Sequence, residues 1–383
     1  MNIENKIEKV ILKALNASVE GSAKKVNISI TNNHNNEMEI VGFVGDVTTK
    51  VGFKSDLKTD FIAHCNLLEL KKFGINGIDF GLKKNNVKFG DVTEKTYDNC
   101  VKLNLNDFNN LYGLCDYTKR NIINHVWVNG DFVYDCNGHY LIKSRCDVNY
   151  GKQFGIHKNV YHFIKDLKDS DFDVFVKWNE IVIKGKNTVM DTRIDVIAKD
   201  SDIDLHIAFK SEVNKVDFDM YDNLIVSTVS ENKNKLSFSM NSKDFIDGFK
   251  GIKNPCDRVY MNVNETDNTL EYYNVYKGHT LAQITTVVRA NVKNVREVQK
   301  NSEEPHNNIL LNTDYTALFK NALKHEKTAK FNMYRLVRTC DGEKGGKAVH
   351  YHKLFVESEK VQIIIMGIIE SMIVDSADNN DNE

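Results

Sequence analysis

The sequence predicts an α+β protein made of repeats of one unit, a short amphipathic helix followed by three strands. Units of this kind begin near residues 3, 58, 106, 154, 236 and 308, which makes six copies. Their strand runs alternate apolar and polar residues and are separated by Asn or Gly turn signals. A chain of 383 residues is long enough for several cores, and pairing the units gives three domains of two halves each.

The six helices are predicted from apolar residues that recur three and four positions apart. Ile7, Val10 and Ala14 show this spacing in the first helix, and Phe163 and Leu167 show it in the fourth. In chain order, the predicted helices are Ile3–Asn16, His64–Gly74, Phe108–Asn121, Lys158–Lys168, Ser242–Lys253 and Thr313–Glu326.

The strands are predicted from runs rich in β-branched and aromatic residues. After the fourth helix they are Phe172–Trp178, Glu180–Gly185 and Asn187–Asp195. After the sixth they are Lys330–Thr339, His350–Ser358 and Lys360–Gly367. Leading strands are expected at Phe154–His157 and Asn308–Asn312, and two additional strands at Ile203–Phe209 and Asn223–Val229.

Polar connectors set the predicted domain limits, because Pro-rich linkers are absent from a chain with only two prolines. The limits are 1–104 for the first domain, 105–200 for the second, with extra strands up to residue 234, and 235–375 for the third. Residues 376–383 are acidic and Asn-rich, as expected of a disordered tail. The alternative is an ordinary α+β chain whose units are similar by accident.

Seven scattered cysteines without a CxxC arrangement indicate a reducing compartment. Met1–Val10 is too polar for a signal peptide, and no apolar run approaches the ~18 residues of a membrane span. We therefore expect a cytoplasmic protein that does not bind membranes.

Charge is distributed unevenly along the chain. The net charge is −2, yet the six predicted helices carry 15 basic residues, nearly all lysine, against 9 acidic ones. Helices with this excess can bind a polyanion, and lysine contacts phosphate without reading bases. The alternative is that these lysines are ordinary solvated residues on exposed helix faces.

The run His125–Arg145, HVWVNGDFVYDCNGHYLIKSR, carries the most specific resemblance. It resembles a stretch of the bacterial DNA polymerase III beta-subunit family, the DNA sliding clamps, in which a strand ends in Thr-Asp-Gly-His-Arg-Leu. Here that stretch reads Cys-Asn-Gly-His-Tyr-Leu over residues 136–141, so the Thr-Asp pair and the Arg are replaced. The apolar run Lys360–Gly367 matches the last strand of the family. The Asn- and Lys-rich composition and the divergence are typical of a phage clamp, which would act in a bacterial cell or a phage-infected host.

The resemblance implies three clamp-like domains with antiparallel sheets outside and helices inside, in a homodimeric ring that encloses double-stranded DNA. The partners would be double-stranded DNA, bound without sequence preference, and a DNA polymerase and clamp loader, each bound through a short apolar peptide. The side chains expected to contact DNA are Lys6, Lys9, Lys13, Lys71, Lys72, Lys119, Arg120, Lys158, Lys165, Lys168, Lys250, Lys253, Lys320 and Lys324.

The resemblance also implies a pocket for the partner peptide. Gly138, His139, Tyr140 and Leu141 would line one wall, and the other would consist of Ile365 and Met366. For Tyr140 and Leu141 the alternative is simple core packing.

The function expected from this resemblance is that of a processivity factor, with no catalytic residue, cofactor or metal. The Gly342–Lys347 segment, GEKGGK, lacks the spacing of a phosphate-binding loop. The alternatives are a clamp-fold scaffold or adaptor for transcription or virion proteins that does not encircle DNA, and an enzyme whose site the sequence does not reveal.

Overall fold

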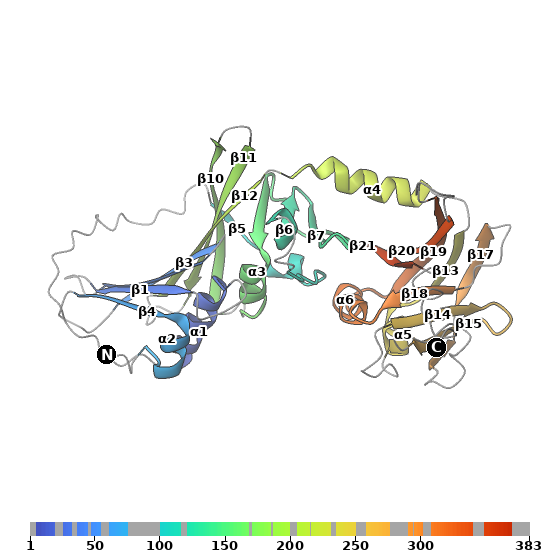
Figure 1. The fold of residues 1–383 in the computed structure, drawn as a ribbon, viewed down its shortest axis with the longest axis horizontal. Coiled ribbons are helices and arrows are strands. Elements are labelled where there is room, and N and C mark those ends of the chain that lie inside the picture. Colours follow the sequence, from blue (N-terminus) through green and yellow to red (C-terminus); the bar gives the residue numbers. More distant parts are fainter. Residues whose placement is uncertain are drawn as a thin grey trace, which may run out of the picture. The chain divides into compact units, whose positions relative to one another are not determined.

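The computed structural model describes most of the chain, and its contacts group the residues into two compact units (Figure 1). The described residues are 5–19, 26–32, 37–44, 47–54, 61–75, 100–115, 121–167, 171–184, 187–199, 205–214, 216–230, 235–249, 258–275, 290–293, 295–301, 308–339 and 348–369. Unit 1 comprises Met1–Phe108, Gly113–Asp131 and Asp147–Val216. Unit 2 comprises Asn109–Tyr112, Phe132–Cys146 and Asp217–Glu383. The division into three domains at the predicted limits stays a prediction.

The elements of unit 1 are a succession of strands and short helices. They are α1 Asn5–Asn16, β1 Asn27–Asn32, β2 Glu37–Val44, β3 Val47–Lys54, β4 Phe61–Asn66, α2 Leu67–Phe73, β5 Val101–Lys102, the 3₁₀ helices η2 Leu105–Phe108 and η3 Asn121–Asn124, β6 His125–Asn129, β9 Gln153–His157, α3 Lys158–Lys165, β10 Phe172–Lys184, β11 Asn187–Ala198 and β12 Leu205–Asn214.

Unit 2 also consists of strands and helices. They are β7 Phe132–Cys136, β8 Tyr140–Arg145, α4 Phe218–Ser230, β13 Lys235–Asn241, α5 Ser242–Gly248, β14 Arg258–Asn264, β15 Thr269–Val275, β16 Ala290–Lys293, β17 Arg296–Asn301, β18 Asn308–Asn312, α6 Tyr315–Ala322, β19 Thr328–Thr339, β20 Ala348–Glu357 and β21 Val361–Ile369.

Unit 1 is built around one antiparallel sheet with the strand order β4-β1-β2-β3-β12-β11-β10-β5. Strands from the start of the chain join strands that follow α3 at the β3–β12 pair, where Val51 lies opposite Ile207. Ile30, Ile40 and Val51 line up across neighbouring strands and are fully buried. This apolar row forms the core of the unit on one face of the sheet.

Helices α1 and α3 cover that same face. Thr49 of β3 donates a hydrogen bond to the carbonyl oxygen of Ala14 in α1, over 3.5 Å. Phe209, which lies opposite Thr49 on β12, contacts Phe163 of α3 with ring centroids 5.2 Å apart. Side chains that lie opposite one another in a ladder point to the same face of the sheet. Both helices therefore pack on the core face, which places their polar sides away from the sheet.

Unit 2 contains two sheets. One has the strand order β17-β13-β19-β20-β21-β8-β7, and a four-stranded one has the order β16-β15-β14-β18. Helix α5 packs against both, because the ring of Phe245 lies 4.3 Å from that of Phe331 on β19 and 6.2 Å from that of Tyr272 on β15. Phe319 of α6 completes the cluster, 5.0 Å from Phe245. These aromatic rings form the core of the unit.

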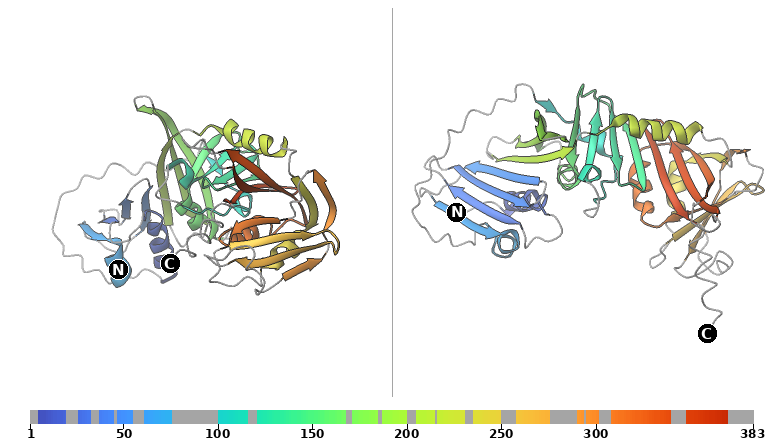
Figure 2. Two further views of the ribbon diagram at one scale, coloured as in Figure 1. Left: turned by 45° about the vertical axis from the view of Figure 1, so that its right-hand side comes forward. Right: turned by 45° about the horizontal axis from the view of Figure 1, so that its top comes forward.

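Helix α4 lies on the opposite face of the larger sheet of unit 2. Lys353 of β20 donates from Nζ to Oγ1 of Thr228 in α4, over 3.2 Å. Val356, three residues further along β20, points to the other face, where it lies opposite Phe331 of the aromatic core. Figure 2 shows α4, in yellow-green, across the strands of its own unit. The larger sheet of unit 2 is thus covered on both faces.

The predicted fold class is confirmed, since antiparallel sheets with helices packed on them make up both units. Five of the six predicted helices are present, although α2, α3, α5 and α6 are shorter than predicted within the described residues. The predicted start of the second helix, His64–Asn66, is wrong, because these residues belong to β4. None of the described helices is long and apolar enough to cross a membrane.

The predicted helix Phe108–Asn121 is wrong for residues 109–115, which the structure describes as turn and coil. Gly113 has a φ of 73°, in the left-handed region that interrupts an α-helix. The backbone N–H of Tyr112 donates to the carboxylate of Asp135 over 3.0 Å. A contact with a distant strand thus replaces the helical hydrogen bond that local spacing predicted.

The predicted strand Asn223–Val229 is also wrong, because these residues lie in α4. The β-branched residues favour a strand locally, but Phe218, Tyr221, Ile225 and Thr228 are buried at helical spacing. Packing of this face on the sheet outweighs the strand preference, which amounts to only a few tenths of a kcal/mol per residue.

The predicted strands Phe172–Trp178 and Glu180–Gly185 form one strand, β10, within the described residues. A bulge between Asn179 and Val182 shifts the register with β11 at the position of the predicted turn. The Asn there marks an irregularity in one long strand and not the end of a short one.

Candidate nucleic-acid interface

Helices α1 and α2 present a row of exposed lysines on the side of unit 1 away from the sheet. In α1, Ile11, Ala14 and Leu15 are buried, while Lys6, Lys9 and Lys13 are exposed. Lys6, Lys9 and Lys13 follow one another at intervals of three and four residues, so they share the polar face of the helix. The amphipathic pattern of the sequence thus places the cations where a ligand can reach them.

Helix α2 begins at a capping box that fixes its position after β4. The side chain of Asn66 accepts from the N–H of Glu69 over 2.9 Å, and the Glu69 carboxylate accepts from the N–H of Asn66 over 3.0 Å. Leu67 and Leu70 are buried. Lys71 and Lys72 in the last turn are exposed, where cations are favoured by the helix dipole.

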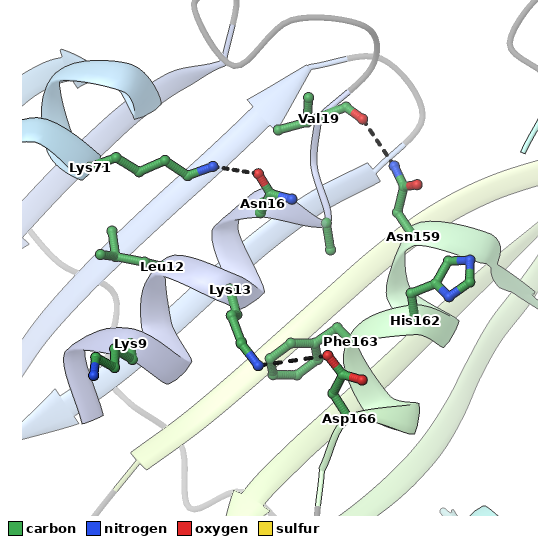
Figure 3. A pocket seen from close by; sticks show the side chains of 11 residues that line it. Lys9, Leu12, Lys13, Asn16, Val19, Lys71, Asn159, His162, Phe163 and Asp166 are labelled. Atoms are coloured by element: carbon green, nitrogen blue, oxygen red, sulfur yellow. Dashed lines mark hydrogen bonds and ion pairs between the residues drawn. The ribbon is translucent and has the colours of Figure 1, made fainter. Parts of the chain in front are cut away.

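A hollow of 750 Å³ lies between α1, α2 and α3 (Figure 3). Its polar lining consists of Lys9, Lys13, Lys71, Asn16, Asn159 and His162, with Asp166 beside Lys13. The apolar lining consists of Leu12, Ala17, Val19 and Phe163. Three cations from two helices thus line one depression together with apolar side chains.

Two hydrogen bonds tie the walls of the hollow together. Lys71 donates from Nζ to Oδ1 of Asn16 over 2.6 Å, which links α2 to α1. Asn159 of α3 donates from Nδ2 to the carbonyl oxygen of Val19, just after α1, over 2.9 Å. Lys13 and Asp166 lie 3.6 Å apart, and both are well exposed, so their ion pair is weak.

The two faces of the unit 1 sheet differ in how their cations are paired. On the face away from the helices, Lys50 lies 3.9 Å from Glu39, and Arg193 lies 2.7 Å from Asp195. On the helix side, no described carboxylate is within ion-pairing distance of Lys6, Lys9 or Lys72. Among the described residues, these lysines of α1 and α2 produce a positive potential on the helix side.

Lys158 differs from the expectation that it contacts DNA, because it is fully buried. Its Nζ donates to the carbonyl oxygen of Leu114 over 3.0 Å. Lys165 is half-buried and donates to the hydroxyl of Tyr161 over 2.9 Å. Both lysines therefore act within unit 1 in this structure, and neither belongs to the exposed row.

The remaining predicted cations are in unit 2 or outside the described residues. Lys320 lies on α6 and Lys324 just after it, and both are exposed. Lys119, Arg120, Lys168, Lys250 and Lys253 lie outside the described residues.

The structure brings the six residues predicted to form the peptide pocket together in unit 2. Strand β21 pairs with β8, and Ile365 lies opposite Tyr140. The N–H of Met366 donates to the carbonyl oxygen of His139 over 2.9 Å. Gly138 adopts a φ of 87° in the turn before β8, a conformation that favours glycine. The two predicted walls are adjacent strands.

Only part of this set is exposed. Gly138 and His139 are exposed, and Met366 has 37% of its surface exposed. Tyr140, Leu141 and Ile365 are buried. The hydroxyl of Tyr140 donates to the carboxylate of Asp135 over 3.1 Å, as a core residue would.

Sequence reasoning missed helix α4 beside this set. Tyr221 of α4 stacks on Tyr134 of β7, with ring centroids 5.8 Å apart. Met220, Leu224 and Val226 of α4 are exposed apolar side chains. The helical spacing of the buried residues in 218–228 was the signal that could have revealed the helix.

Comparison with known proteins shows similarity in structure alone. No protein-family model matches the sequence, and no curated protein sequence matches it. The Caulobacter crescentus beta sliding clamp is 13% identical, with a TM-score of 0.56, and covers 94% of this chain and 97% of its own. DNA polymerase III subunit beta from Borrelia burgdorferi is 12% identical, with a TM-score of 0.57 and coverage of 95% and 96%.

A putative DNA polymerase III beta subunit from Eubacterium rectale is 12% identical, with a TM-score of 0.54 and coverage of 94% and 98%. The chain therefore has the beta sliding clamp fold over nearly its whole length. The predicted resemblance is confirmed at the level of the fold.

Proposed function

We propose that this chain is a DNA sliding clamp, a processivity factor that encircles duplex DNA as a ring of two copies and tethers the replicative polymerase. The observation that carries the proposal is the exposed lysine row of α1 and α2, backed by a continuous sheet in a clamp fold. Those helices present cations, while on the opposite face of the sheet Lys50 and Arg193 are paired with carboxylates.

Lysine ammonium groups suit a ligand that must be held and still move. They neutralise phosphates as mobile point charges and lack the planar fork that reads guanine. Binding of this kind depends on salt and not on sequence. Retention on DNA then comes from ring closure, and sliding meets little resistance. The chain makes and breaks no covalent bond in this role.

The exposed Gly138, His139 and Met366 support a docking site for a short apolar peptide from the polymerase and the clamp loader. Met366 offers an apolar contact, and Gly138 leaves the backbone of the turn open to close approach. Tyr140 and Ile365 are buried and support this site as core residues. Helix α4 adds the exposed Met220 and Leu224 in the same unit.

An order-of-addition experiment tests encirclement without a clamp loader. A linear duplex biotinylated at both ends is mixed with the protein, and streptavidin is added either after or before it. A ring that has threaded over a free end is trapped by later streptavidin and survives a wash in about 0.5 M NaCl, which removes electrostatic contacts. When streptavidin comes first, no salt-resistant protein is expected.

Equal retention in the two orders would contradict encirclement and favour a clamp-fold adaptor that does not enclose DNA. Light scattering tests the two-copy ring, because it measures the mass of the protein in solution. Twice the mass of one chain is expected, and a single-chain mass at all concentrations would contradict the two-copy ring.

A further inference from the structure

The hollow between α1, α2 and α3 is lined partly by apolar side chains, which duplex DNA would not contact. Phosphates of a duplex need only its cations Lys9, Lys13 and Lys71, whereas the lining also includes the apolar side chains of Leu12 and Phe163. Bases in a duplex are stacked on one another, so their faces cannot contact apolar side chains of the hollow. An unstacked single strand exposes the faces of its bases. The hollow's volume of 750 Å³ falls within the range of about 300–1,000 Å³ that is typical of pockets for small ligands.

We infer that this hollow binds an unpaired nucleotide of single-stranded DNA, with the base against the half-buried Leu12 and the phosphate beside the lysines. The inference deepens the proposed function and rests on it, because it requires the helix side of unit 1 to meet DNA. A cationic rim that tracks the backbone, combined with an apolar or aromatic platform for bases, is the general chemistry of single-strand binding.

The polar groups of the hollow fit this ligand. Oδ1 of Asn16 already accepts from Lys71, so the amide nitrogen of Asn16 is the group left to donate to an oxygen of the base. Among the described residues, Lys13 is held only by its exposed pair with Asp166, which a phosphate can replace. Lys9 has no described carboxylate within ion-pairing distance. Lys9 and Lys13 can therefore turn to a phosphate at little cost.

The wall that α3 contributes is fixed in advance. Asn159 is bonded to the carbonyl oxygen of Val19, and Nε2 of His162 lies 2.8 Å from the carbonyl oxygen of Gly113. Phe163 is held against Phe209 of the sheet. A preformed wall loses little conformational freedom on binding, which favours capture of a flexible strand.

The test compares single-stranded and duplex DNA on the full chain. Fluorescence anisotropy with labelled oligothymidylate of about 20 nucleotides and a duplex of the same length measures both affinities at low salt. Leu12→Gln removes apolar surface at a half-buried position while keeping a good helix former. Affinity for the single strand is expected to fall about 5- to 10-fold, as for the loss of one base-stacking contact. Affinity for the duplex is expected to stay unchanged.

Lys6→Ala is the matched control, because Lys6 is exposed on the same helix and does not line the hollow. It is expected to lower both affinities by the same factor. An equal loss of both affinities in Leu12→Gln, or no loss of either, would overturn the inference. If the wild-type chain did not bind duplex DNA but Leu12→Gln still lowered the affinity for the single strand, the result would contradict the proposed function alone.

Photocrosslinking of the wild-type chain does not depend on a variant that must fold. An oligothymidylate that carries 5-iodouracil is expected to crosslink to the peptides of α1 or to Phe163. Crosslinks found only in other segments would overturn the site. Thymidine 5′-monophosphate at the same nucleotide concentration is expected not to displace the oligonucleotide, and displacement would overturn the assignment to a strand.

Discussion

Lys143 of β8 and Asp222 of α4 form an ion pair in which Nζ lies 2.7 Å from Oδ1. The side chain of Lys143 is only 15% exposed, and its Nζ also lies over the ring of Phe132, 4.2 Å from the centroid. The hydroxyl of Tyr134 donates to the same carboxylate over 3.2 Å. Burial, and secondly the charge of Asp222, raise the pKa of Tyr134, so the phenol remains a donor. Asp222 is thus the polar anchor of α4 on the sheet.

Asp222→Ala is expected to lower the free energy of unfolding by about 1–2 kcal/mol, because it leaves a largely buried ammonium and a buried hydroxyl without their acceptor. Urea unfolding followed by circular dichroism measures the change. Asp219→Ala, at an exposed position of the same helix, is the control and is expected to change stability by less than about 0.5 kcal/mol. Equal effects of the two substitutions would contradict the anchoring role.

The Val226→Ala substitution tests whether residues 218–230 form a helix or the strand that the sequence favours locally. Val226 is 64% exposed, so propensity and not packing dominates the effect. In a helix, replacing the β-branched residue by alanine is expected to stabilise by about 0.5 kcal/mol. In a strand the same change would destabilise. A lower free energy of unfolding for Val226→Ala would therefore contradict the helical state of residues 218–230.

The double substitution of Lys9 and Lys13 by alanine is expected to weaken duplex binding and to reduce its salt dependence. Each phosphate contact contributes about 0.9 to the slope of log affinity against log salt, so the slope should fall by about 1.8. Anisotropy titrations at several salt concentrations measure it. Lys50→Ala, on the ion-paired face of the sheet, is the control and is expected to leave the slope unchanged. A fall in the slope of about 0.9 for Lys50→Ala, the value for one phosphate contact, would contradict the assignment of DNA binding to the helix side of unit 1.

Acid is expected to destabilise unit 1 through His157. Burial, and secondly the charge of Lys158, lower the pKa of His157 from 6.5 to about 4. Above pH 6.5 neither state binds the proton; as pH falls towards 4, the unfolded chain takes it up and the folded chain does not. Stability is therefore lost as pH falls through this window, by at most about 3 kcal/mol.

His157→Asn tests the source of that loss. Nδ1 of His157 accepts from the N–H of Asn159 at the start of α3, and asparagine can keep this cap without titrating. The difference between urea midpoints at pH 7.5 and pH 4.5 is expected to shrink in the variant. An unchanged difference would assign the acid sensitivity to other groups.

The sequence predicted elements well wherever local spacing and packing agree. The strand Asn308–Asn312 has the predicted bounds, and α1 ends at the predicted residue, Asn16. The predictions failed where distant contacts decide. The carboxylate of Asp135 captures a backbone N–H inside one predicted helix, and the sheet of unit 2 holds residues 218–230 in a helix.

The same limit applies to the site. Spacing along α1 correctly placed Lys9 and Lys13 on an exposed face, because that depends on one helix alone. The burial of Lys158 depends on a carbonyl group 44 residues away, at Leu114. The hollow depends on the approach of α2 and α3 to α1, which no local pattern encodes.

The joining of β3 and β12 in one ladder has a consequence for dissecting the chain. A fragment that ended at residue 104 would lose β12 and expose the backbone groups of β3 from Val47 to Phe53. Bare strand edges recruit other chains, so such a fragment should aggregate or dimerise through that edge. We therefore expect the smallest autonomously stable piece of this protein to extend beyond the limit that the repeating pattern predicts.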